Sequence, residues 1–139
     1  MSLEAQRVWV ETLCKRQMAT QYPAVPIKFE NAVFAQPETP WIALFILDGS
    51  AFQTELGEQT VDRHTGLVHV DVLVPQNTGT SQANTIAEFV GNVFRRQTAT
   101  MSDGAVVRFR VPSMTKLGEQ NGFYRLVCRI PYIRDEVRR

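Results

Sequence analysis

The feature that most constrains the fold is a strand-like alternation followed, after one polar loop, by helix-like spacing, all between Gly66 and Gln97. Four valines occupy every second position from 68 to 74, and His69 and Asp71 fall between them. Because strand side chains alternate between two faces, this segment predicts a half-buried strand. From about residue 80 the apolar positions follow the spacing of an amphipathic helix, at Ile86, Phe89, Val90, Val93 and Phe94.

The other elements are predicted from the same two periodicities. An apolar stripe over residues 3–20 indicates a helix, which the prolines at 23 and 26 end. We expect further strands at 27–35, 41–47, 105–111 and 123–132, a polar turn at 116–121 and a frayed, charged tail at 134–139. The polar segment 51–65 is interpreted as a long hairpin whose arms extend past the core.

This order of elements predicts an α+β fold. We expect a mainly antiparallel, twisted sheet of about five strands, with two helices packed on one face and one long projecting hairpin. With 139 residues and 44% hydrophobic side chains, the chain is expected to form a single domain over 1–139.

The sheet face away from the helices is predicted to be polar. The residues expected on it are Arg108, Arg110, Arg125, Arg129, His69 and Asp71. Four arginines are costly to cover with an apolar core, so this face is expected to meet water, a cavity or another polymer.

Charge is distributed unevenly along the chain. Residues 1–94 carry 5 basic and 10 acidic side chains, whereas residues 95–139 carry 10 basic and 4 acidic ones, for a net charge of +1. This asymmetry suits a subunit whose two ends meet different surfaces, including its own copies, and it is also compatible with chance.

The cysteines and the lack of long apolar runs suggest a compartment. Cys14 and Cys128 fall on apolar faces and are predicted to be buried structural thiols. No apolar run reaches membrane-spanning length and the N-terminus does not look like a signal peptide, so we expect a protein kept in a reducing cytoplasm with no membrane partner.

No catalytic pattern, cofactor motif or metal site is predicted, and we expect the protein not to be an enzyme. His69 and Asp71 could supply two metal ligands, but a third and fourth are missing nearby, so a solvated histidine is the preferred interpretation. Arginines beside Phe123 are compatible with a platform for single-stranded nucleic acid. One aromatic side chain is few for such a platform, and cross-strand ion pairs explain the arginines equally well.

Three segments, in order and spacing, carry a resemblance to a known family. They are Tyr22–Asn31 with Pro40-Trp41, Gly66–Pro75 with Gly79-Thr80 ahead of the second helix, and Asn121–Arg125 with Ile130–Tyr132. In these segments the chain resembles the tail terminator (tail completion) proteins of long-tailed bacteriophages (siphoviruses), of which the lambda tail terminator is a familiar member. Phe29 stands where tryptophan is more usual, a departure that concerns packing.

The resemblance implies a structural virion protein. Its subunits would form a hexameric ring that caps the tail tube, stops tube polymerisation and provides the surface for head attachment. The implied partners are further copies of the chain, the tail tube protein, a head–tail connector protein, and genomic DNA passing through the lumen without sequence-specific binding. The implied location is the head-proximal end of the virion tail, after assembly in the host cytoplasm.

Within such a ring, the polar face would line the lumen or a subunit interface, and the 48–66 hairpin would contact neighbouring subunits or the tube. The hairpin residues expected to make these contacts are Phe52, Glu55, Glu58, Asp62 and Arg63. Three alternatives stay open: another head–tail connector or neck completion protein, a single-stranded nucleic-acid-binding domain, and a small-molecule enzyme with a deep pocket around His69 and Asp71.

Overall fold

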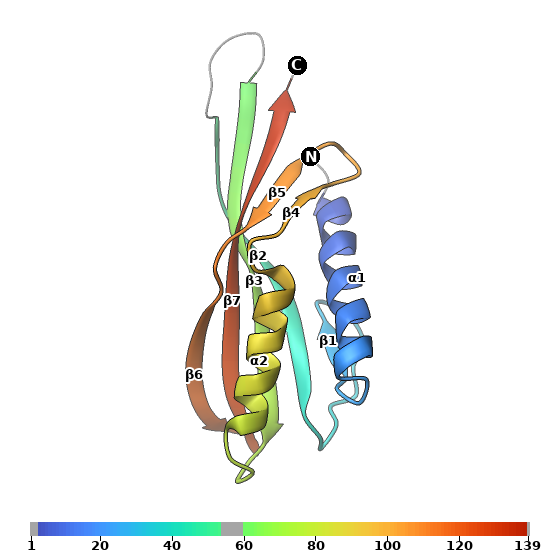
Figure 1. Ribbon diagram of the computed structural model, residues 1–139, viewed down its shortest axis with the longest axis vertical. Helices are drawn as coiled ribbons and strands as arrows, with labels where there is room; N and C mark the ends of the chain where they lie inside the picture. The colour runs from blue at the N-terminus through green and yellow to red at the C-terminus, as the bar shows by residue number, and fades with distance from the viewer. Residues whose placement is uncertain (1–2, 54–59, 139) are drawn as a thin grey trace.

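The computed structural model describes residues 3–53 and 60–138 (Figure 1). Two helices and seven strands lie within these residues. They are α1 Leu3–Gln21, β1 Ile27–Phe29, β2 Trp41–Gln53, β3 Thr60–Pro75, α2 Ser81–Phe94, β4 Thr98–Thr100, β5 Val106–Phe109, β6 Ser113–Gln120 and β7 Phe123–Arg138.

The strands form one sheet in the order β1-β2-β3-β7-β5-β4, and β6 pairs with the part of β7 that β5 leaves free. The β1–β2 pair is parallel, and the other pairs are antiparallel. The predicted α+β class is confirmed. The sheet is mainly antiparallel, as predicted, but the β1–β2 pair makes it mixed, and with seven strands over the described residues it is larger than the predicted five.

Both helices contribute to a dry core on one face of the sheet. Even-numbered residues of β3 from 68 to 74 and of β7 from 124 to 132 point into this core, because strand side chains alternate. The fully buried side chains include Val10, Met18, Ile42, Val68, Val70, Val72, Ile86, Phe94 and Ile130. Trp9 of α1 stacks on Phe109 of β5 with ring centroids 5.4 Å apart, so the first helix is tied to the sheet by aromatic packing. Each large apolar side chain that is fully buried in this core contributes about 1.5–3 kcal/mol to stability.

The strands β3 and β7 run the length of the molecule and pair without a register shift, from Thr60 opposite Arg138 to Pro75 opposite Phe123 (Figure 1). We call the part that the helices cover the body. The arm is the continuation beyond them, formed by residues 48–53, 60–66 and 132–138. Over the described residues, β7 accompanies the predicted projecting hairpin as a third strand, and β5 adds a fourth strand at its base by pairing with residues 132–135.

Gly66 marks the junction between body and arm. A Cβ atom built there would lie 2.4 Å from the Leu47 carbonyl oxygen and 2.6 Å from the Tyr132 hydroxyl oxygen. Tyr132 in turn donates a hydrogen bond of 3.1 Å to Asp48 Oδ1, which locks β7 across the junction to β2. Only a residue without a side chain fits where the three strands approach so closely.

Three local predictions are wrong. The segment predicted as a strand over 27–35 pairs only at β1, and the chain then leaves the sheet edge until Trp41. The predicted polar turn at 116–121 belongs mostly to β6, an edge strand whose side chains are largely exposed and which therefore shows no apolar alternation. The tail predicted to fray from residue 134 continues β7 to Arg138.

Candidate functional site

The face of the sheet away from the helices, which we call the open face, brings four of the six predicted site residues together. His69 lies opposite Arg129 in the β3–β7 register, and Asp71 lies one pair further along, opposite Val127. Arg125 follows on the same face of β7. The valine alternation that predicted the strand therefore also placed these polar side chains on one surface.

Asp71 is the centre of this group. Its side chain is buried, and Arg125 Nη2 donates a 2.8 Å hydrogen bond to its Oδ2 atom. His69 Nε2 lies 2.9 Å from Asp71 Oδ1 and donates to it in the tautomer that carries the proton there. Arg129 Nη1 donates to Thr115 Oγ1 of β6 at 2.9 Å. The cross-strand pairs neutralise much of the charge on this surface.

The end of the open face nearest the β6–β7 turn is apolar, which differs from the predicted polar face. Trp41 and Phe123 are buried there and meet edge to face with ring centroids 6.2 Å apart. Phe34, from the loop after β1, covers Trp41, and the centroids of the two rings are 5.1 Å apart. Trp41 and Phe123 line a hollow of about 270 Å³ together with Asp71 and Arg125. The loop that replaced a predicted strand thus shields the aromatic side chains from water.

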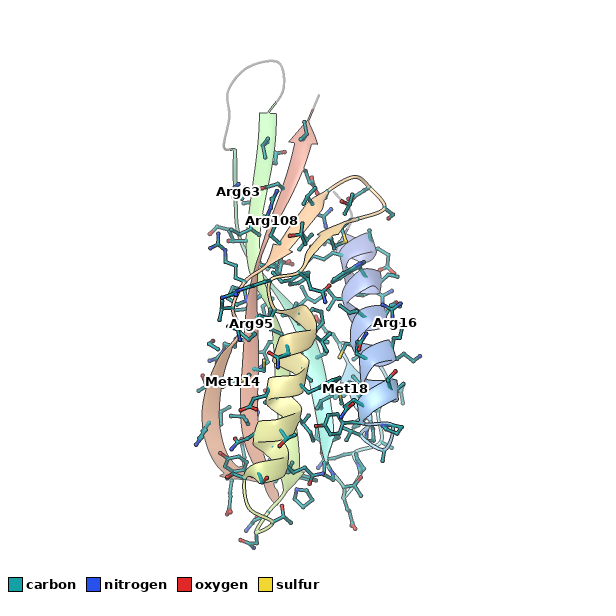
Figure 2. All side chains as sticks on the ribbon, viewed as in Figure 1. Arg16, Met18, Arg63, Arg95, Arg108 and Met114 are labelled. Atoms are coloured by element: carbon teal, nitrogen blue, oxygen red, sulfur yellow. The ribbon has the colours of Figure 1, made fainter. Side chains whose placement is uncertain are left out.

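Arg108 belongs to a different group, at the base of the arm. It donates a 3.2 Å hydrogen bond from Nη1 to Asp135 Oδ2, and Arg63 binds the same carboxylate through Nε at 2.8 Å and Nη2 at 3.0 Å. The two arginines lie near each other in Figure 2. The hydrogen bond from Arg63 and the charge of Arg108 lower the pKa of Asp135.

The remaining predicted residues are dispersed. Arg110 is exposed, beyond the end of β5, and its backbone N–H donates to the Pro131 carbonyl at 2.8 Å. Asp62 lies on the other side of β3 from Arg63, in register with Glu136. Glu55, Glu58 and the side chain of Phe52 lie outside the described residues.

Sequence reasoning missed a buried arginine on the opposite side of the arm. Arg134 is 1% exposed, and it binds Asp103 Oδ2 at 2.5 Å, Glu136 Oε1 at 2.8 Å and Gln6 Oε1 at 3.2 Å. These partners come from the β4–β5 turn, β7 and α1. Arg134 follows Tyr132 by two residues, so strand alternation could have placed it on the core side.

The described residues contain little that suggests catalysis. Both cysteines face the core, where burial raises the pKa of Cys14 and of Cys128 to about 12. Over 3–53 and 60–138, no three His, Cys, Asp or Glu side chains are grouped to hold a metal ion. In the same residues, no helix is long and apolar enough to cross a membrane.

Comparison with known proteins agrees with the resemblance found in the sequence. The sequence model of the phage tail terminator protein family matches residues 10–132. The chain belongs to this family. It is therefore a virion protein with a structural role in tail completion.

Two further comparisons concern sequence and fold. A solved structure is similar over 96% of this chain and 96% of its own, with a TM-score of 0.74 and 18% sequence identity. At that identity the likeness shows a shared fold. A comparison with curated protein sequences found no match.

Proposed function

We propose that this tail terminator forms a hexameric ring that caps the tail tube at its head-proximal end, stops tube polymerisation and provides the head-attachment surface. Its partners would be other copies of the chain, the tail tube protein and a head–tail connector protein. Membership of the family carries this proposal. A head-to-tail contact between copies forms such a ring when its rotation closes. Both halves of that contact are then used in every subunit, so no further copy can be added to the ring.

The open face is proposed to approach the lumen, through which genomic DNA passes without sequence-specific binding. Free arginines in a narrow channel would bind phosphates and slow the DNA, because each neutralised phosphate releases counterions. The pairing of Arg125 with Asp71 reduces this attraction. Among the described residues, the guanidinium of Arg129 donates a hydrogen bond to a hydroxyl group and not to a carboxylate. Of the two arginines on this face, Arg129 therefore keeps more of its positive charge available to a polyanion.

The arm is proposed to contact neighbouring subunits or the tail tube. It extends beyond the helices, and its described part carries Asp62 and Arg63 (Figure 1). Its base is held by the Asp135 and Arg134 groups, so the arm would meet a partner as an ordered element.

The decisive experiment is electron microscopy of purified protein mixed with tail tubes of the same phage. We expect a ring at one end of each tube and tubes of uniform length when the protein is present during polymerisation. Tubes that stay uncapped and grow without limit would contradict the proposal. Binding to single-stranded nucleic acid that weakens steeply with salt would favour the alternative function instead.

A pair of variants distinguishes the effect of a charge on the open face from the effect of the same charge change elsewhere on the surface. Arg129→Glu places a carboxylate on the open face, whereas Lys15→Glu makes the same charge change on the exposed surface of α1. We expect capped tubes from both variants, with DNA-filled virions reduced only for Arg129→Glu. Equal yields of DNA-filled virions from the two variants would contradict the proposal that the open face approaches the lumen.

A further inference from the structure

We propose that two copies of the chain form an antiparallel pair through α1, in which an exposed ridge of each helix fills an apolar groove of the other. The contact is two-fold symmetric, so the same surface of both copies takes part in it. It is distinct from the proposed ring, which needs a head-to-tail contact between two different surfaces. Because a two-fold pair is closed, it would cover the groove of an unassembled subunit without starting a polymer.

The receiving surface is an apolar groove of about 590 Å³ between α1 and the segment 97–102. Its more deeply buried lining side chains are apolar, and they are Ala5, Trp9, Leu13 and Met101. Such a groove favours an apolar occupant, because contact there removes apolar surface from water. It lies on the side of the sheet that the helices cover, so its occupation leaves the open face free (Figure 1).

A ridge of exposed side chains runs along α1 at the rim of this groove. Its members follow one another at intervals of four residues, and they are Glu4, Val8, Thr12 and Arg16. Rows of residues four apart are the ridges that most often interlock when two helices pack. The ridge and the groove are neighbours on one surface, as a two-fold contact requires, because each copy must both insert a ridge and receive one.

The charges at the two ends of the ridge select an antiparallel pair. Glu4 and Arg16 are equally distant along α1 from the level of Val10. A two-fold axis beside Val10 therefore places Glu4 of each copy opposite Arg16 of the other, so that opposite charges meet twice. A parallel pair would bring Glu4 against Glu4 and Arg16 against Arg16, which is repulsive.

The middle of the ridge supplies the apolar part of the contact. Val8 is 46% exposed in the single chain, although it lines an apolar groove. The same axis brings Val8 of each copy opposite Thr12 of the other, beside the groove residues Trp9 and Leu13. Burial of Val8 thus provides affinity, and the charged ends fix the direction of the two helices.

Glu4 is only partly neutralised within its own helix. Arg7 pairs with Glu4, but it also binds Glu11 at 3.1 Å, so one guanidinium serves two carboxylates. The side chains of Glu4 and Arg7 are 68% and 47% exposed, and exposed pairs of this kind contribute little. Arg16 of a second copy would therefore meet a carboxylate that can still accept a partner.

Sedimentation equilibrium over about a hundredfold range of protein concentration tests the pair. We expect the wild-type protein to show a monomer–dimer equilibrium. Arg16→Glu should raise the dimer Kd at least about tenfold, because it turns two attractions in each dimer into two repulsions. The double variant Glu4→Arg, Arg16→Glu exchanges the charges across the axis, so its Kd should return to within about threefold of the wild-type value.

The matched control is Lys15→Glu, which makes the same charge change one position earlier on α1, at an exposed residue that does not line the groove. Its dimer Kd should equal that of the wild-type protein, and circular dichroism checks that every variant is folded. A wild-type protein that stays monomeric throughout, or equal Kd values for Lys15→Glu and Arg16→Glu, would overturn the pair. Failure of the folded double variant to regain dimerisation would overturn the antiparallel order. None of these outcomes bears on the ring, which microscopy of capped tubes tests separately.

The fluorescence of Trp9 shows whether the groove itself closes. The chain has two tryptophans, so Trp41→Phe leaves Trp9 as the only one. Because Trp9 is partly buried in the single chain and lines the groove, its emission should shift to shorter wavelength as the dimer fraction rises. A dimer that forms without any change in Trp9 emission would place the contact elsewhere on the chain and overturn this inference.

Discussion

The body and the arm are built from the same two long strands, but they are stabilised in different ways. In the body, β3 presents four valines to the core, all of them fully buried beneath the helices. In the arm, the same strands carry charged side chains that are held by Asp135 on one side and by Arg134 on the other.

The difference teaches where each part can tolerate change. Apolar burial is non-directional, so the body gains stability from many contacts at once. Exposed ion pairs contribute at most about 1 kcal/mol each, and a buried pair depends on every one of its partners. The body therefore supplies most of the folding free energy, and the arm keeps its shape through a few specific contacts.

Hydrogen exchange along β7 should show the contrast most strongly. The amides of Leu126, Cys128 and Ile130 lie in the body, whereas those of Asp135 and Val137 lie in the arm. We expect the body amides to exchange on the order of a thousandfold more slowly, because the arm can open without unfolding the core. Uniform protection along β7 would show that body and arm form one cooperative unit.

Ile130→Ala should destabilise the protein by about 3 kcal/mol, since it leaves a cavity in a side-chain site that is fully buried. The matched change in the arm, Val137→Ala, removes an exposed side chain and should cost less than about 0.5 kcal/mol. Chemical denaturation of both variants measures the two values. Similar costs would mean that the arm carries a core of its own.

Arg134→Ala should cost about 3 kcal/mol, because it leaves the carboxylates of Asp103 and Glu136 without their shared buried cation. Arg129→Ala, on the same strand, removes a partly exposed guanidinium and should cost about 1 kcal/mol or less. Equal unfolding free energies for the two variants would show that burial of Arg134 contributes nothing.

Acid should weaken the arm through Asp135. The pKa of this carboxyl is lowered in the folded state, so its contribution to stability is full above its unfolded pKa of about 4 and is lost as the pH falls through the folded value. Asp135→Asn should therefore flatten the pH dependence of the unfolding free energy below about pH 4. The expected change is smaller than that for Arg134→Ala, and an unchanged acid profile would contradict it.

Periodicity allowed the body to be predicted from the sequence. The alternating valines and the helical stripe around Ile86 depend on local patterns, and the structure confirms both as a strand and a helix. The same alternation placed His69, Asp71, Arg125 and Arg129 on one surface. These features follow from neighbours in sequence, which a single chain displays.

What the sequence did not reveal depends on contacts between distant segments. Arg134 was interpreted as part of a frayed tail because a charged run near a terminus is usually solvated. Its partners Gln6 and Asp103 come from segments that are distant in the sequence, so no local pattern predicts these contacts. The edge strand β6 was missed for a related reason, since a strand that is exposed on both faces lacks apolar alternation.

The uninterrupted register of β3 and β7 has a mechanical consequence. Tension applied to the arm along its strands is borne in shear by hydrogen bonds along the whole of Thr60–Pro75, so they share the load and do not fail one after another as in a peeled hairpin. Gly66 keeps the strands in close contact at the narrowest point of this ribbon. A pull along the strands of the arm would thus be transmitted through this ribbon to the part of the sheet that lies beneath the helices.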